Sequence, residues 1–142
     1  MYKKLLCVLL CLSIGYIAWT KSYIYNIDKA VSHVETSALS KSHTCCAWFV
    51  MRAMNAGGCP IGILPAFAYK EVLPKYGFVE IDKNSSYRKG DIVVFPAIKN
   101  HIYGHIAMWT GKQWISDFKQ KSIFPAKGYR YSDYRIFRYK GI

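Results

Sequence analysis

Apolar residues in the first half of the chain recur at steps of three and four, which places side chains on one face of an α-helix. This spacing predicts helices over residues 27–38, 46–56 and 66–73. Asn26 or Asp28 could cap the first helix, Gly57 and Gly58 would end the second, and Pro74 would stop the third. The first half of the chain is therefore expected to be helical.

Beyond residue 77 the spacing changes to the alternation that is typical of half-buried strands. The expected strands are Phe78–Ile81, Asp91–Ala97, His105–Gly111, Gln113–Phe118 and Tyr134–Tyr139. Polar and glycine-containing turns separate them. Because the helices precede the strands, we expect an α+β domain in which N-terminal helices pack against a five-stranded antiparallel sheet.

Residues 1–22 have a different composition, with Lys3 and Lys4 ahead of an apolar run from Leu5 to Trp19. This is the layout of a secretory signal or of an uncleaved membrane anchor. The run is shorter than the roughly 20 residues that span a bilayer, which favours a signal, whereas Trp19 and the tyrosines after it could form an interfacial belt. We therefore expect export to the periplasm or the outside of the cell. If the leader is not cleaved, residues 5–19 would anchor the protein in the inner membrane. Residues 23–142 are expected to form one domain.

The chain is strongly basic, with 20 Lys and Arg against 8 Asp and Glu and a net charge of +12. Seven of these cations lie between Lys119 and the C-terminus, where Asp133 is the single acid. Such a surface attracts nucleic acid, anionic lipid headgroups or a cell wall rich in carboxylates and phosphates. The leader argues against nucleic acid, so a wall or an anionic membrane surface is expected. A solubilising surface with no specific partner is the alternative.

Two adjacent cysteines, Cys45 and Cys46, open the second predicted helix. Val50 and Ala53 share the helix face of Cys46, so this thiol should point toward the core. A thiol at the first turn of a helix also feels the positive end of the helix dipole, which would lower its pKa and favour the nucleophilic thiolate. A Cys45–Cys59 disulfide is the alternative, although the chain geometry puts that pair near the upper limit for a bridge.

His105 is the candidate base, because it follows Gly104 at the start of an alternating strand. Asp117 lies on the next expected strand, where it could accept the second imidazole N–H and fix the tautomer. A nucleophile, a base and an orienting acid would together form a thiol hydrolase site. A structural histidine and a turn-forming acid are the alternative readings of His105 and Asp117.

Two further function classes fit some of the same residues. His101 and His105 could ligate zinc together with Cys45 or Cys46, although this histidine spacing spans a turn that enters a strand. A wall- or membrane-binding module without catalysis would also use the basic C-terminal stretch. The thiol hydrolase reading needs no metal or other cofactor.

Two stretches carry a resemblance to a known family. "CAWFVMRAMNAGG" (residues 46–58) looks like the Cys-Ala-x-x-Val-Arg helix of cell-wall amidases, and "KGDIVVF…GHIAMWTGKQWISDF" looks like their core hairpin. On these motifs the chain resembles papain-like cell-wall cysteine hydrolases of the NlpC and CHAP kind. The stretch Thr44-Cys45-Cys46-Ala47 stands where the NlpC branch typically has Asp-Cys-Ser. The motif is therefore more similar to that of the CHAP-like amidases and of the amidase effectors of type VI secretion.

The resemblance implies a papain-like fold and hydrolysis of an amide in the stem peptide or cross-link of peptidoglycan through a thioester. Carried over, Cys46 would be the nucleophile, His105 the base and later the acid, and Asp117 the orienting residue. The backbone N–H of Cys46 would be one oxyanion donor. The expected substrate contacts are His43, Trp48 and Trp114. The expected partners are peptidoglycan and an immunity or inhibitor protein.

Overall fold

The computed structural model describes residues 23–141. The predicted leader, residues 1–22, lies outside the described residues, so its role as signal or anchor stays a prediction. Within residues 23–141 no helix combines the length and the apolar character needed to cross a bilayer.

Two helices form where the hydrophobic spacing predicts them. Helix α2 spans Ile27–Ser37, and the Asn26 side chain caps it by accepting a 2.9 Å hydrogen bond from the backbone N–H of Lys29. Helix α3 spans Cys46–Ala56, as predicted. Both present apolar faces inward, and they pack against each other.

The third predicted helix is broken into shorter pieces. The structure has a 3₁₀-helix at Ala66–Ala68, the α-helical turn α4 at Tyr69–Val72 and a second 3₁₀-helix at Leu73–Tyr76. Pro74 lies within that last helix, so the prediction that it stops a continuous helix is wrong. A proline is tolerated in the first turn of a helix, where its missing N–H would have no intrahelical acceptor.

Five antiparallel strands form one sheet in the order β1-β5-β2-β3-β4. The strands are β1 (Phe78–Ile81), β2 (Ile92–Phe95), β3 (His105–Trp109), β4 (Trp114–Ile115) and β5 (Arg135–Tyr139). The last strand of the chain therefore lies inside the sheet, between β1 and β2. The predicted α+β architecture, with N-terminal helices on a five-stranded antiparallel sheet, is confirmed.

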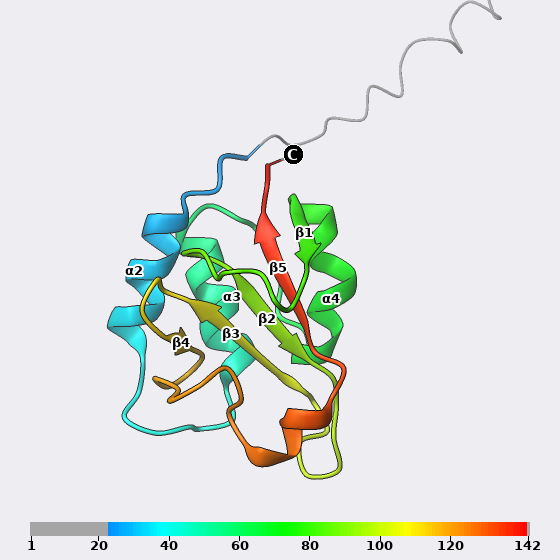
Figure 1. The fold of residues 1–142 in the computed structure, drawn as a ribbon. Helices are drawn as coiled ribbons and strands as arrows, with labels where there is room; N and C mark the ends of the chain where they lie inside the picture. The colour runs from blue at the N-terminus through cyan, green and yellow to red at the C-terminus, as the bar shows by residue number, and fades with distance from the viewer. Residues whose placement is uncertain (1–22, 142) are drawn as a thin grey trace, which may run out of the picture.

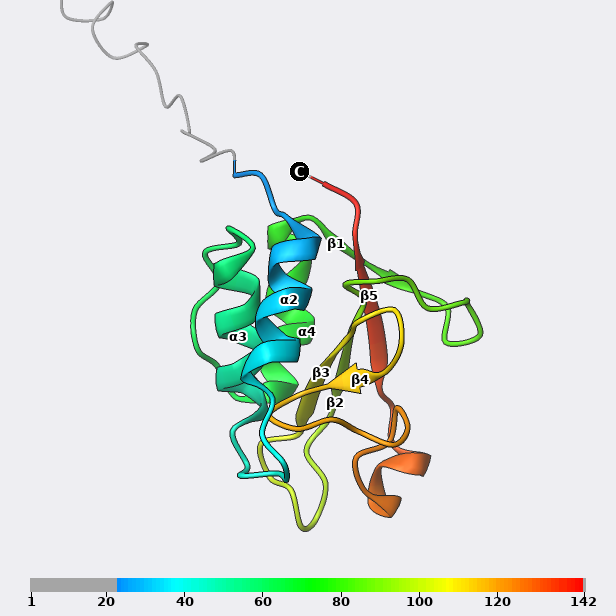
Figure 2. The same ribbon diagram turned by 90° about the vertical axis from the view of Figure 1, so that its left-hand side faces the viewer.

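The helices and the sheet form two layers (Figures 1 and 2). Helices α2, α3 and α4 cover one face of the sheet, as the side view in Figure 2 shows. The loop after β1 and the long segment between β4 and β5, which includes a 3₁₀-helix at Lys127–Tyr131, lie on the other side. Both faces of the sheet are thus covered.

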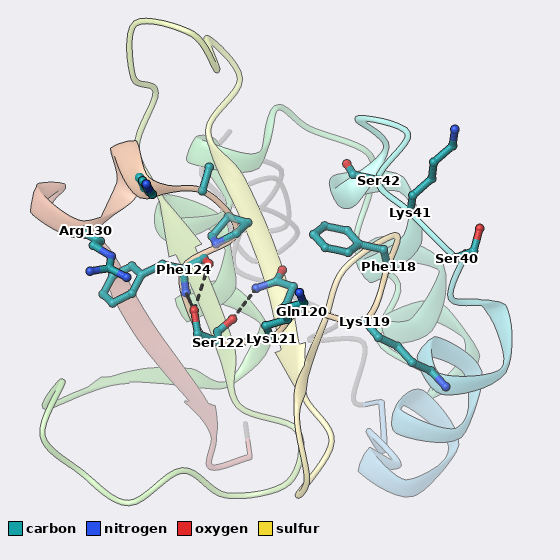
Figure 3. A pocket seen from close by; sticks show the side chains of 13 residues that line it. Ser40, Lys41, Ser42, Phe118, Lys119, Gln120, Lys121, Ser122, Phe124 and Arg130 are labelled. Carbon is teal, nitrogen blue, oxygen red and sulfur yellow. Dashed lines mark hydrogen bonds between the residues drawn. The ribbon is translucent and has the colours of Figure 1, made fainter.

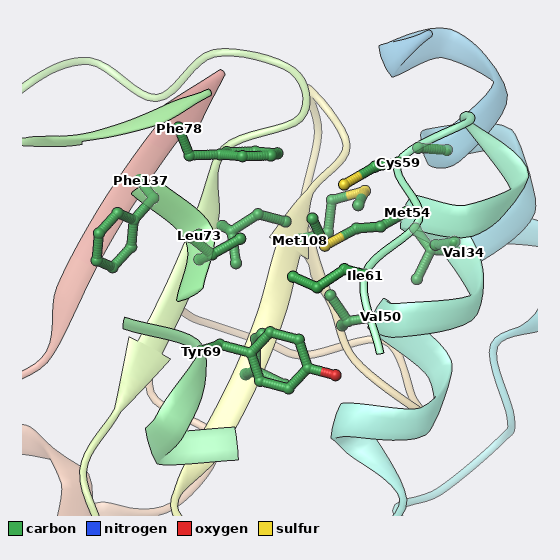
Figure 4. Close-up of a cluster of buried hydrophobic side chains, with 14 of the residues drawn as sticks. Val34, Val50, Met54, Cys59, Ile61, Tyr69, Leu73, Phe78, Met108 and Phe137 are labelled. Atoms are coloured by element: carbon green, nitrogen blue, oxygen red, sulfur yellow. The ribbon is translucent and has the colours of Figure 1, made fainter. Parts of the chain in front are cut away.

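Each face of the sheet has its own hydrophobic cluster. On the helix side, Val50 and Met54 of α3 belong to the same buried cluster as Ile106 and Met108 of β3. Figure 4 shows Val50, Met54 and Met108 in this cluster. On the opposite side, a second cluster contains Val93, Phe95, Ala107, Trp114, Tyr129 and Ile136. Each large side chain buried in this way stabilises the fold by about 1.5–3 kcal/mol before conformational entropy is counted.

Strand β4 is shorter than the predicted Gln113–Phe118. After Ile115 the chain turns, with the backbone N–H of Ser116 donating to the carbonyl of Phe118, so Asp117 lies in a bend rather than on a strand. The backbone carbonyl of Asp117 accepts from the N–H of Leu39. This bend therefore connects the edge of the sheet to the loop between α2 and α3.

Candidate active site

The first residue of α3 and the first residue of β3 line the same cavity. Cys46 and His105 both contribute to this space of about 470 Å³, which we call the Cys46–His105 cavity. Other lining residues come from the loop before α3, the β2–β3 turn and the segment before β5, among them Thr44, His101 and Tyr129. The fold thus brings together the two residues that the sequence suggested as nucleophile and base.

Gly104 allows the chain to enter β3 with the histidine at its start. Its φ of +70° lies in the left-handed region that favours glycine. A Cβ atom at this position would also collide with the carbonyl oxygen of Phe95, on the paired strand β2. The Gly-His pair noted in the sequence is therefore required by the backbone that positions His105.

The imidazole of His105 is held by Gln120. The Nε2 atom of His105 lies 2.7 Å from Oε1 of Gln120, and the Gln120 amide nitrogen donates to the carbonyls of Ser122 and Ile123 at 3.1 and 3.2 Å. Carbonyl oxygens only accept, so these two bonds fix which end of the Gln120 amide faces His105. Oε1 also only accepts, so Nε2 carries the proton and Nδ1 keeps its lone pair. Nδ1 is therefore the nitrogen that can take up a proton.

Burial keeps His105 neutral. The residue is only 7% exposed, and desolvation lowers the pKa of its imidazole to about 4, against an ordinary value of 6.5. The hydrogen bond that the imidazole donates to Gln120 and the charge of Asp117 both raise the pKa of His105, and the charge of His101 lowers it. At neutral pH the ring is an uncharged base.

Burial also controls the Cys46 thiol. Desolvation raises the pKa of this thiol above its usual range, and the negative charge of Asp117 raises it as well. Backbone hydrogen bonds, of which the one from Ile106 has the largest effect, lower the pKa but do not offset this rise. The prediction that the helix N-terminus lowers the Cys46 pKa is therefore wrong for the resting protein. The first turn of α3 is packed against the core, and loss of hydration outweighs the helix dipole.

The resting pair is thus a neutral thiol and a neutral imidazole. Such a pair can act by general-base catalysis, in which the imidazole takes the thiol proton as the sulfur attacks. The positively charged imidazolium would form only during the reaction. Its formation would be favoured by the Gln120 acceptor and by the negative charge of Asp117.

Asp117 has a different place from the one predicted. It is fully buried, and its Oδ2 accepts from the backbone N–H groups of His43 and Cys45 at 2.6 and 3.2 Å, with the Ser42 hydroxyl at 3.4 Å. The carboxylate therefore holds the loop that leads into α3. The predicted hydrogen bond to the imidazole is replaced by that of Gln120, because the chain has left the sheet before residue 117.

None of the three predicted substrate contacts lines the Cys46–His105 cavity. Trp114 is 2% exposed and packs against Tyr87 and Trp109, with ring centroids 5.1 and 5.4 Å apart, so it does not reach this cavity and its contact with substrate stays a prediction. It faces the sheet side that the 116–134 segment covers. His43 is exposed in the loop before α3, and Trp48 is 48% exposed on α3 beside Arg52.

The structure also tests the two alternative roles considered for the cysteines, a disulfide and a zinc site. Cys45, Cys46 and Cys59 are free thiols; Cys45 is exposed, whereas Cys59 is buried with its sulfur 3.6 Å from the Tyr23 hydroxyl. The considered Cys45–Cys59 disulfide is therefore not formed. Among residues 23–141 no three His, Cys, Asp or Glu side chains are placed to hold a metal ion, so the zinc alternative lacks a ligand set in that part of the chain.

Sequence reasoning missed Gln120 and Tyr129. Gln120 is only 4% exposed although it follows the sheet edge, and this burial of a polar side chain cannot be read from the spacing of residues. Tyr129 packs its ring near those of His101 and His105 at centroid distances of 5.3 and 6.1 Å. It lies in a 3₁₀-helix that the spacing of apolar residues did not predict. Both residues reach the site from the irregular segment between β4 and β5.

Comparison with known proteins gives one clear relationship. No protein-family model matches the chain, and no curated protein matches it. The crystal structure of the native type VI effector–immunity complex Tae3–Tai3 from Ralstonia pickettii contains a chain that is 32% identical, with a TM-score of 0.76; the match covers 81% of this chain and 99% of that one. The selenomethionine form of the complex matches at 31% identity over 77% and 98% of the two chains, with a TM-score of 0.72. At this identity and coverage the relationship extends beyond the fold, and the chain belongs to the family of the type VI effector Tae3.

Proposed function

We propose that the chain is a peptidoglycan amidase that cleaves an amide of the stem peptide or cross-link by thiol chemistry. One observation carries the proposal: Cys46 and His105 line one cavity, and Gln120 holds the imidazole in the tautomer that leaves Nδ1 free to accept a proton. Membership of the Tae3 family and the resemblance to cell-wall amidases support the peptidoglycan substrate. The resemblance to the NlpC and CHAP branches in particular stays a prediction.

The first half of the reaction forms a thioester. The Cys46 proton moves to Nδ1 of His105 as the sulfur attacks the amide carbonyl carbon. The resulting tetrahedral oxyanion is stabilised by backbone N–H groups at the start of α3, which have no acceptor within the helix. The C–N bond then breaks, and the imidazolium gives its proton to the departing amine.

The second half of the reaction restores the thiol. His105 removes a proton from a water molecule, and the hydroxide attacks the thioester carbonyl. When the C–S bond breaks, the sulfur leaves as a thiolate and takes the proton back from the imidazolium. The product is a carboxylic acid, and no metal or redox partner enters either half.

The proposal includes a partner and a compartment. The related Ralstonia protein was solved in an effector–immunity complex, so we propose that this chain also has an immunity protein. The substrate lies outside the cytoplasm, in agreement with the basic charge and with the export predicted for residues 1–22. The anionic membrane surface stays a prediction.

Purified protein incubated with isolated peptidoglycan tests the proposal, with the released fragments identified by mass spectrometry. We expect newly formed amine and carboxyl ends at one type of amide, which also names the bond. Cys46→Ala should abolish this release. Cys45→Ala is the matched control, because its sulfur is exposed and lies outside the cavity lining, and it should keep most of the activity.

The alternative of a non-catalytic wall-binding module makes the opposite prediction. Such a module would bind peptidoglycan without releasing fragments, and Cys46→Ala would bind equally well. Release that is equal in Cys46→Ala and the unmodified protein would also contradict the thiol mechanism. Circular dichroism of both variants would show that the comparison is made between folded proteins.

A further inference from the structure

A second cavity of about 520 Å³ lies beside the Cys46–His105 cavity, and its lining is strongly basic (Figure 3). We call it the basic cavity. Its cations are Lys41, Lys119, Lys121, Lys127 and Arg130. They come from three separate segments: the loop before α3, the stretch after β4 and the 3₁₀-helix at Lys127–Tyr131. The fold thus gathers charges that are up to 89 positions apart in the sequence.

The two cavities adjoin each other. Ser42, Phe118, Pro125 and Ala126 line both of them. Gln120 also lines the basic cavity, and its Oε1 accepts a hydrogen bond from His105. One side chain therefore contacts the basic cavity and holds the imidazole of the Cys46–His105 cavity. A ligand that crosses from one to the other would place its two parts on the cations and on the thiol.

The salt bridges within residues 23–141 do not involve the cations of the basic cavity. Among the described residues, the salt bridges use Lys70, Lys83, Lys89, Arg135 and Arg138, none of which lines this cavity. Neither the basic cavity nor the Cys46–His105 cavity has an acidic side chain among the described residues that line it. The nearby Asp117 carboxylate is buried and is used by the loop before α3. Unpaired cations brought together in a concave site favour an anionic ligand.

We propose that the basic cavity is the anion subsite of the active-site cleft and holds carboxylate groups of the peptide whose amide reacts at Cys46. The proposal rests on the proposed function and deepens it, because it assigns specificity to peptides that carry free carboxylates near the scissile bond. Phe118 and Pro125 add an apolar wall for the peptide between these groups. Lysine is a point charge on a flexible stem, so several lysines suit carboxylates at more than one position.

The test compares two double variants with the same change in net charge. Lys119→Gln/Lys121→Gln removes two cations of the basic cavity, and Lys75→Gln/Lys140→Gln removes two exposed lysines that line neither cavity. With a soluble stem peptide, we expect the first variant to raise KM about fivefold or more and to leave kcat within about twofold. The second variant should change neither parameter. A peptide whose carboxylates are amidated should show no difference among the three proteins.

A binding measurement separates this proposal from the proposed function. Cys46→Ala in the full chain, titrated calorimetrically with the same carboxylate peptide, should bind it, and adding Lys119→Gln/Lys121→Gln should weaken that binding by the same factor. This result would support the subsite even if no hydrolysis were found. Hydrolysis with unchanged binding in the cavity variant would overturn the subsite and leave the amidase proposal intact.

Two further results would overturn the proposal. Equal losses in the two double variants would mean general attraction to a basic surface rather than a subsite. Stronger competition by a glycerol phosphate polymer than by the carboxylate peptide, at equal concentration of charge, would assign the cavity to phosphate instead.

Discussion

At the scale of single residues, the chemistry of this site depends on which nitrogen of His105 carries the proton. Gln120 decides this, because two carbonyls fix its amide and leave its oxygen for Nε2. The same burial that protects this hydrogen bond removes the charge from the imidazole and keeps the Cys46 thiol protonated. The site therefore holds a neutral thiol and a neutral imidazole, without a resting ion pair.

Gln120→Ala should impair catalysis more than folding. Without its acceptor the imidazole is free to rotate and to change tautomer, so we expect kcat to fall about 10- to 100-fold. The Gln120 hydrogen bond raises the pKa of His105, so its loss should also move the acid limb of the kcat/KM profile to lower pH. Steady-state kinetics over a pH series would measure both effects.

Gln113→Ala is the control for that change, since Gln113 lies in the turn between β3 and β4 and lines neither the basic cavity nor the Cys46–His105 cavity. It should leave the profile as it is. If the Gln120 and Gln113 variants had the same kcat and the same acid limb of the pH profile, the proposed orienting role of Gln120 would be refuted.

The low pKa of His105 predicts how stability depends on pH. Between its ordinary pKa of 6.5 and its folded pKa of about 4, the unfolded chain binds a proton at this residue that the folded protein does not. The free energy of unfolding should therefore rise as pH increases through this window, by up to about 3 kcal/mol from this one group. Urea unfolding at several pH values between 4 and 7 would measure the slope.

His105→Gln isolates that contribution, because glutamine has no titrating group. The difference in unfolding free energy between the unmodified protein and this variant should change with pH across the window and level off above it. A difference that stays constant from pH 4 to 7 would contradict the lowered pKa.

At the scale of elements, the loop before α3 is held in a strained conformation by a buried carboxylate. Thr44 has a φ of +60°, which is costly for a β-branched residue, by about 1–3 kcal/mol. Asp117 accepts from the backbone N–H on each side of it, at His43 and Cys45. This pair of bonds secures the turn that places Cys46 at the helix start. Asp117 thus supports the loop before Cys46 by hydrogen bonds and acts on His105 only through its charge.

Asp117→Ala should destabilise the protein by about 2–4 kcal/mol, because two partly buried backbone N–H groups lose their buried acceptor while the strained turn remains. Activity should fall as well, since the start of α3 would lose its support. Asp133→Ala provides the comparison: its carboxylate is exposed and pairs with Lys83 at 3.2 Å, so its removal should change the stability much less. Chemical denaturation would show whether the two losses differ; equal losses would refute the bracing role.

At the scale of the whole molecule, the end of the chain completes the middle of the sheet. Strand β5 pairs with both β1 and β2, so the last described residues join two parts of the fold that are separated in sequence. Arg138 of this strand donates from Nε and a terminal nitrogen to the fully buried Asp91, at 2.9 and 2.7 Å. Asp91 also accepts from the backbone N–H of Arg88.

Arg138→Met should destabilise the whole fold by about 3–5 kcal/mol, because it leaves the buried Asp91 charge without its partner. Arg135→Met on the same strand is the matched change: Arg135 forms an exposed pair with Glu80 at 3.3 Å, and its loss should cost less than about 1 kcal/mol. In thermal unfolding, the melting temperature of Arg138→Met should lie many degrees below that of Arg135→Met. Similar melting temperatures would mean that the buried pair contributes little.

Local patterns in the sequence determined most of the elements and indicated the two candidate catalytic residues. The spacing of Val50 and Ala53 fixed the inward face of α3 and with it the side of Cys46, and the Gly104-His105 pair marked a strand start that only a glycine permits. These features depend on residues a few positions apart, so periodicity and backbone sterics suffice to find them. The helices, the antiparallel sheet and the two candidate catalytic residues were predicted for this reason.

Only the tertiary structure decided what surrounds those groups. The segment after β4 leaves the sheet after two residues, which moves Asp117 to the loop before α3 and brings Gln120 to His105. The burial that shifts the pKa values of Cys46 and His105 likewise comes from distant elements packing together. Spacing along the chain records none of this, because desolvation and hydrogen-bond partners depend on contacts between residues that are far apart in sequence.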